Sequence, residues 1–120
     1  METELFQLEF YVLPGGTKPA EEFILSLPPK MQVKAFDSLE ILEEKGSTLR
    51  EPYSKSLSGG LFELRIRFEK DISRVFYFFF SGGRIILTNG FIKKTQKTPK
   101  AQLILAKKYK DDFERRHQHE

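Results

Sequence analysis

The feature that most constrains the fold is the stretch LFELRIRFEKDISRVFYFFFSGGRIILTNGFIKK, residues 61–94. A glycine pair precedes it, and two breaks divide it, at Lys70-Asp71 and at Gly82-Gly83. Gly-Gly is a strong hairpin signal and Lys-Asp a weaker one. The pattern predicts three consecutive antiparallel strands joined by two-residue turns.

The first half of the chain predicts one strand and two helices. In residues 6–12, apolar side chains alternate with polar ones, which is strand periodicity. Residues 18–27 and 31–46 have helical spacing, and Pro28-Pro29 separates them. Gly46 suits the position just past a helix end. The apolar face expected for the second helix consists of Met31, Ala35, Leu39 and Leu42, with Phe36 beside them.

Helical spacing returns after Pro99, through Leu103, Ala106, Tyr109 and Phe113. The predicted order is therefore β-α-α-β-β-β-α, an α+β fold with a mainly antiparallel sheet. With 120 residues and no linker, we expect a single domain over residues 1–114. Residues 115–120 have nothing to bury and are predicted to be a disordered tail.

The composition excludes several kinds of active site. The chain has no cysteine, and its two histidines are His117 and His119 in the tail, so neither a catalytic triad nor a zinc site is expected. The carboxylates lie at solvated helix positions, and no phosphate-binding glycine motif occurs. We therefore expect no metal and no cofactor. No apolar run reaches the roughly 18 residues of a membrane helix and no leader is recognisable, so we expect a cytoplasmic protein.

The charge is divided unevenly along the chain. Residues 1–83 hold 10 Lys and Arg against 13 Asp and Glu, whereas residues 84–120 hold 10 against 4. Four of the lysines, at 93, 94, 97 and 100, follow the last predicted strand directly. This asymmetry indicates either an anionic partner for the basic half or only a soluble surface.

Two-residue turns predict a register for the three strands. Arg67 then lies opposite Arg74, Arg65 opposite Phe76, and Arg74 opposite Phe91, and opposed residues share a face. One face is expected to carry Arg65, Arg67, Arg74, Asn89, Phe91 and Lys93. The other is expected to pack on the two helices and carries Phe62, Leu64, Ile66, Val75, Tyr77, Phe79, Ile86 and Thr88.

The opposed arginines admit two interpretations. Like charges directly across a ladder are destabilising. A salt-bridge network with Glu63 and Glu69 would relieve the repulsion, because both acids share this face. A bound phosphate would also relieve it, since two or three guanidinium groups can clamp one phosphodiester.

The motifs GLFELRIRF, SRVFYFFF and ILTNGFIKKTQKTP, followed by a helix, resemble the HigB/RelE-like toxins of bacterial toxin–antitoxin pairs, in particular their phage-associated HigB branch. The resemblance covers nearly the whole chain. It implies a microbial-ribonuclease-type sheet with two N-terminal helices and metal-independent cleavage of mRNA, usually on the ribosome. It also implies a helix-turn-helix, HigA-like antitoxin partner, in a complex expected to be heterotetrameric on operator DNA.

In RelE-like relatives, basic residues on adjacent strands and after the last strand carry the activity. By strand position, the resemblance implies catalytic roles for Arg65, Arg67, Arg74, Lys93 and Lys94. The chemistry fits these residue types: arginine stabilises the phosphorane, and lysine serves as the base where neighbouring cations lower its pKa.

Further residues are candidates for binding RNA. Phe91 either stacks a base or packs on the sheet, and Asn89 either contacts RNA or caps local structure. Lys97 and Lys100 either hold the RNA backbone or only solvate a turn. Lys55 and Arg50, in the loop before the second predicted strand, are candidates to border the same end of the sheet.

The sequence does not identify the residue that donates a proton to the leaving oxygen. Many relatives have a Tyr, His or Asp near the C-terminus; here the candidates are Tyr109, expected to be buried, and the two tail histidines, His117 and His119.

Two rival functions remain open. One is a toxin of this fold that poisons DNA gyrase, as ParE-like relatives do, and the other is a non-catalytic module that binds nucleic acid or antitoxin. The antitoxin either covers the arginines or docks on the N-terminal helices. Their acidic outer faces, including Glu40, Glu43 and Glu44, favour the helices.

Overall fold

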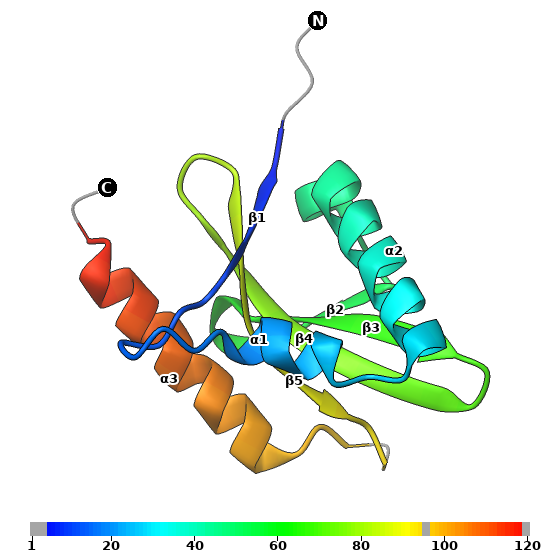
Figure 1. Cartoon of the computed structure of the whole chain (residues 1–120). Helices are drawn as coiled ribbons and strands as arrows, with labels where there is room; N and C mark the ends of the chain where they lie inside the picture. The colour runs from blue at the N-terminus through cyan, green and yellow to red at the C-terminus, as the bar shows by residue number, and fades with distance from the viewer. Residues whose placement is uncertain (1–4, 95–96, 119–120) are drawn as a thin grey trace, which may run out of the picture.

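The computed structural model describes residues 5–94 and 97–118. Within this part of the chain, five strands form one sheet in the order β1-β5-β4-β3-β2, and three α-helices pack on it (Figure 1). The predicted α+β class and the predicted order of elements are confirmed. The elements are β1 (Gln7–Phe10), α1 (Pro19–Leu25), α2 (Pro29–Lys45), β2 (Ser54–Ser56), β3 (Phe62–Phe68), β4 (Asp71–Phe80), β5 (Arg84–Ile92) and α3 (Lys100–Arg116).

Two features of the sheet go beyond the prediction. β1 pairs with β5 in parallel, so the sheet is mixed, while the other neighbouring strands are antiparallel. β2 is a short additional strand at the edge beside β3. Two 3-10 turns, η1 (Gly46–Thr48) and η2 (Ser58–Gly60), flank this region.

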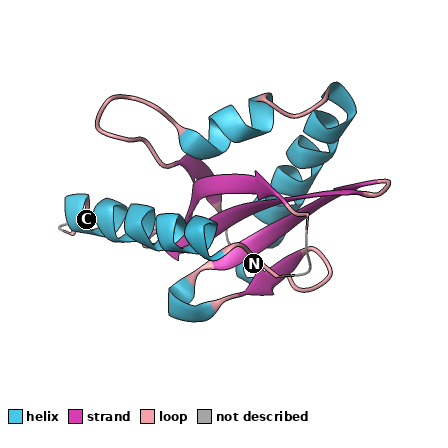
Figure 2. Ribbon diagram, turned by 90° about the horizontal axis from the view of Figure 1, so that it is seen from below, coloured by secondary structure: helices cyan, strands magenta, loops and turns pink. Residues whose placement is uncertain are grey.

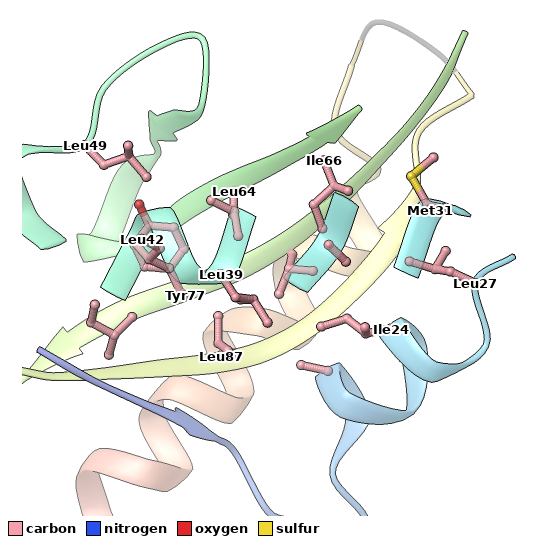
Figure 3. Packing of buried hydrophobic residues seen from close by; sticks show 14 residues of the cluster. Ile24, Leu27, Met31, Leu39, Leu42, Leu49, Leu64, Ile66, Tyr77 and Leu87 are labelled. Atoms are coloured by element: carbon pink, nitrogen blue, oxygen red, sulfur yellow. The ribbon is translucent and has the colours of Figure 1, made fainter. Parts of the chain in front are cut away.

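The helices cover both faces of the sheet (Figure 2). α1 and α2 lie on one face, over a core to which α2 contributes the four apolar residues predicted for it (Figure 3). α3 lies on the other face and buries Ala106 and Phe113 against Phe76 and Phe78. Because both faces are covered, β4 is buried from Ser73 to Phe78.

The register of the first hairpin differs from the prediction. Phe68 pairs with Asp71, so the turn is Glu69-Lys70 rather than Lys70-Asp71, and Glu69 adopts a left-handed φ of 55°. Arg65 therefore lies opposite Arg74, and the predicted pairs of Arg67 with Arg74 and of Arg65 with Phe76 are wrong. The shift moves each pairing by an even number of residues, so the predicted sharing of one face by the three arginines survives.

The second hairpin also departs from the expected register, but only near its turn. Phe80 pairs with Arg84 across a three-residue turn, which places Ile86 opposite Phe78 in the core under α3. The prediction that Ile86 faces the two N-terminal helices is therefore wrong. Between the pairs Tyr77–Leu87 and Val75–Gly90, β4 advances by two residues and β5 by three, so β5 carries one extra residue there. Beyond it, the predicted pairing of Arg74 with Phe91 is restored.

The C-terminal helix extends past residue 114. α3 includes Arg115 and Arg116, and the ring of His117 stacks on that of Phe113 with centroids 3.9 Å apart. The boundary expected at residue 115 therefore falls inside the helix. Among the described residues, no helix has the length and apolar character to cross a membrane.

Gly90 on β5 permits the close approach of α1 to the sheet. A Cβ atom at this position would lie 2.3 Å from a ring carbon of Phe23 and 2.9 Å from the carbonyl oxygen of Arg74.

We expect Gly90→Ala to lower the free energy of unfolding, measured by urea denaturation, by about 2 kcal/mol, because the added methyl group overpacks the core. Gly15→Ala is the control, since no atom lies within 4 Å of its added Cβ. A loss as large in Gly15→Ala would contradict this account.

Candidate nucleic-acid interface

Two strands, β3 and β4, bring the predicted arginines to one end of the sheet, on the face that carries α3. Arg65 from β3 and Arg74 from β4 lie directly opposite one another, and Arg74 pairs with Phe91 of β5 on its other side. The backbone N–H of Lys93 donates to the carbonyl of Ile72 at 2.9 Å, which extends the ladder past the end of β5. We call Arg65, Arg74, Lys93 and Lys55 the basic cluster.

Arg74 has a counter-ion within the protein. Its Nε donates to Oε1 of Glu63 at 2.8 Å, and their side chains are only 4% and 1% exposed. The second carboxylate oxygen of Glu63 accepts a hydrogen bond from Oγ1 of Thr98 at 2.7 Å. The salt-bridge interpretation is thus realised for Arg74 with Glu63, whereas Glu69 lies exposed at the turn.

The ion pair leaves part of the Arg74 guanidinium unused. Nη1 of Arg74 and Nε of Arg65 are buried and have no hydrogen-bond partner among the described residues. Burial lowers the pKa of Arg74, as do the charges of Arg65 and Arg67, while Glu63 opposes the shift. Donors of this kind are costly to leave unpaired, so the cluster is suited to an anionic acceptor.

Arg65 is the accessible guanidinium of the opposed pair. Its side chain is 24% exposed, and the nearest carboxylate is that of Glu51, 3.9 Å away and itself exposed. A contact of that length and exposure holds the side chain weakly. Arg67 is exposed one step further along β3. Both arginines border a cavity of about 220 Å³ with Tyr53, whose exposed ring the sequence analysis missed.

Lys93 lies within the electrostatic field of the cluster. Its pKa is lowered by partial burial and then by the charges of Arg74, Arg65 and Lys55, with Glu63 opposing them. This is the direction required of a lysine that accepts a proton near neutral pH. Lys94 is exposed beside it, and Lys55 lies on β2 opposite Glu63.

Asn89 and Phe91 are buried. Phe91 is 6% exposed and packs against Phe76 at a centroid distance of 5.4 Å, which fits sheet-face packing rather than base stacking. Asn89 donates to the carbonyl and side-chain oxygens of Gln102, both at 3.2 Å, and so holds the first turn of α3. Lys97 is exposed in the segment that leads to α3.

The candidate proton donors on α3 lie away from the cluster. Tyr109 stacks on Tyr11, with centroids 4.6 Å apart, and is only partly buried, whereas the helical spacing predicted a buried side chain. His117 follows Gln102 by 15 residues, which is roughly 22 Å along a helix. His119 lies outside the described residues. The described residues contain no group of three potential metal ligands.

Thr98 is the contact that the sequence did not indicate. A single threonine among lysines carries no signal of its own, and its role depends on the path of the chain after β5. Glu63 was visible as an acid on the arginine face, but its burial was not.

The family model described as Phage derived protein Gp49-like (DUF891) matches residues 22–111. The match extends from α1 into α3 and includes all the residues of the basic cluster. No curated protein matches the chain.

The first prediction for this site concerns the buried ion pair. Glu63→Gln leaves the Arg74 charge buried without compensation, and we expect the free energy of unfolding at pH 7 to fall by about 3 kcal/mol. Glu114→Gln is the matched control, because it breaks the more exposed Lys110–Glu114 pair, for which about 0.5 kcal/mol is expected. Similar losses in the two variants would show that the Glu63 pair contributes no more than a surface pair.

The second prediction concerns the titration of Lys93. Its side-chain NMR resonance should titrate below the ordinary lysine value of 10.5, because burial and neighbouring cations disfavour the charged form. Arg65→Gln removes one of those cations and should raise the midpoint. Arg115→Gln, at the far end of α3, should leave it unchanged. A midpoint that does not respond to Arg65→Gln would place Lys93 outside the field of the cluster.

Proposed function

We propose that this protein is a HigB-like toxin that cleaves mRNA. The chain belongs to the Gp49-like family of phage-derived proteins, which is a family of RelE/HigB-type toxin-like proteins. Membership of this family indicates a toxin of the toxin–antitoxin type. The endoribonuclease activity is our inference from the basic cluster. The observation that carries it is the pair of buried, unpartnered N–H groups on Arg65 and Arg74, beside a lysine whose pKa is lowered.

The proposed reaction is transesterification within the RNA. The 2′-oxygen attacks the adjacent phosphorus, the bond from phosphorus to the 5′-oxygen breaks, and the products are a cyclic phosphate and a 5′-hydroxyl. Lys93 in its neutral form accepts the proton of the 2′-hydroxyl. We assign the proton that the leaving oxygen requires to Lys94, the next lysine of the same segment. His117 lies too far along α3 for this role, and the ring of Tyr109 is stacked on that of Tyr11.

The arginines stabilise the charge that develops on the phosphorane. Arg74 is held in one orientation by Glu63, and its unpartnered Nη1 adds to the donors of the partly exposed Arg65. A preorganised donor of this kind lowers a barrier by about 3–4 kcal/mol. Arg67 extends the positive surface along β3 toward the next phosphate.

The other contacts orient the RNA chain. Tyr53 is 53% exposed beside Arg65 and Arg67, and we assign to it the base-stacking role considered for Phe91. Stacking of this kind is worth about 1–3 kcal/mol per base. Lys55 and Lys97 then contact flanking phosphates. Asn89 supports the start of α3 and acts on RNA only through that helix.

One observation favours a second candidate function. Because Glu63 already neutralises Arg74, an anion meets one positive charge fewer than the four cations of the basic cluster would supply. That balance suits a non-catalytic module that binds nucleic acid, with affinity that falls steeply as salt rises.

We further propose that the chain acts in the cytoplasm on ribosome-bound mRNA, and that a helix-turn-helix antitoxin inhibits it. A heterotetramer on operator DNA is the assembly we propose for the pair. The exposed acids Glu40, Glu43 and Glu44 on α2 support docking of a basic partner there.

Expression of the wild-type chain should arrest growth and generate new RNA ends with 5′-hydroxyl groups. Arg65→Ala and Lys93→Ala should each reduce cleavage by about 10²–10³-fold, because a phosphorane donor or the base is lost. Both side chains are partly exposed, so the thermal unfolding midpoint should stay near that of the wild type. Lys34→Ala, on α2, is the control and should cleave normally.

Other outcomes point to the rivals. Gyrase-linked DNA breaks with intact mRNA would establish the gyrase-directed toxin instead. RNA binding that depends on salt, without new RNA ends, would establish the binding module. Normal growth on expression of the wild-type chain would overturn the assignment as a toxin.

A further inference from the structure

A second hollow lies at the junction between α1 and α2. It is a cavity of about 560 Å³ with predominantly apolar walls, formed by Leu27, Met31, Phe68 and Ile92 together with Pro28 and Pro29. Lys30 and Asp71 contribute one charge of each sign. A mostly apolar hollow of this size, with few polar groups, is typical of a binding site.

Ser73 places one unsatisfied polar group at this cavity. The residue lines the cavity and is only 1% exposed, and its Oγ is buried without a hydrogen-bond partner among the described residues. Native proteins seldom leave such a group unpaired. An occupant that carries a hydrogen-bonding atom at the end of an apolar body would supply the missing partner.

The cavity lies on the reverse side of the ladder that carries the basic cluster. Ser73 and Ile92 are cross-strand partners, and each immediately precedes a residue of the cluster, Arg74 or Lys93. Side chains alternate between faces along a strand, so Ser73 points away from Arg74. An occupant of the cavity would therefore leave the cluster uncovered.

We propose that this cavity is the docking site for a tyrosine or tryptophan side chain of a partner protein. These two side chains combine a large apolar ring with a polar tip, and they are frequent anchors at interfaces. The tip would bond to Oγ of Ser73. Ile92 is 52% exposed, so it provides apolar surface for the neighbouring part of the partner chain.

Charge defines the partner further. Beyond the exposed Lys30 and Lys34, α2 carries an exposed acidic surface formed by Asp37, Glu40, Glu43 and Glu44. The partner should therefore carry basic residues in the part of its chain that extends from the aromatic anchor along the C-terminal half of α2. We identify this partner as the antitoxin, and that identification rests on the proposed function. The docking site itself does not depend on it.

The first experiment uses side-chain analogues. Titration of the ¹⁵N-labelled protein with p-cresol, indole and toluene should shift the amide resonances of Phe68, Ser73 and Ile92. The two analogues with a polar tip should bind about fivefold tighter than toluene, the value of one hydrogen bond. Ser73→Ala should remove that preference and still bind toluene. Absence of shifts at these amides, or an unchanged preference in Ser73→Ala, would overturn the proposal.

The second experiment tests the partner with the antitoxin co-expressed. Ser73→Leu fills the cavity and Ile92→Asp makes its exposed wall charged, so each variant should still arrest growth but no longer be relieved by the antitoxin. Arg65→Ala should still co-purify with it. If the antitoxin relieved the growth arrest caused by both cavity variants as completely as it relieves that caused by the wild type, docking at this site would be overturned. Should the wild-type chain cause no arrest, the proposed function fails, and the titration with analogues still decides whether the cavity accepts an aromatic anchor.

Discussion

The buried ion pair between Arg74 and Glu63 is the interaction on which the arrangement of the site depends. A guanidinium that is 4% exposed is stable only with a compensating charge, and Glu63 provides it from the neighbouring strand. Thr98 bonds to the same carboxylate, so the pair also ties the segment after β5 to the sheet. These contacts also fix the position of Lys93. The backbone of Lys93 is hydrogen-bonded to Ile72 of β4, and Thr98, further along the same segment, is bonded to Glu63.

The covering of both sheet faces explains why the functional surface lies at one end. α1 and α2 bury one face and α3 buries most of the other, so polar side chains have few places to reach solvent. α3 begins at Lys100, where Asn89 holds its first turn, and the residues of the basic cluster come from the strand segments near this end. At the C-terminal part of α3, Tyr11 donates to Asp112 at 2.6 Å, which fixes the helix across the sheet.

Several details of the strands were beyond prediction for a common reason. A turn of two residues can begin at Lys70 or at Glu69 with little difference in local preference, and the pairing in the structure puts Glu69 in a left-handed conformation. The extra residue of β5, between Leu87 and Gly90, likewise has no local signal in the sequence. The shared face of Arg65, Arg67 and Arg74 was still predictable, because an even shift preserves the parity of every side chain. The pairing of Ile86 differs from the predicted one by an odd number of residues, so the face on which Ile86 lies was not predictable.

The sequence by itself determined the order of elements, the buried faces of α2 and α3, and the gathering of cations near the end of β5. These properties depend on periodicity and on turn residues, which act over a few positions along the chain. Only the tertiary structure decided that Arg74 is neutralised by Glu63, that Phe91 is buried, that Lys93 has a lowered pKa and that Ser73 lines a cavity. Each of these depends on burial and on contacts between segments distant in the sequence. Such contacts set the local dielectric environment and the available hydrogen-bond partners, and neither is encoded in the spacing of residues.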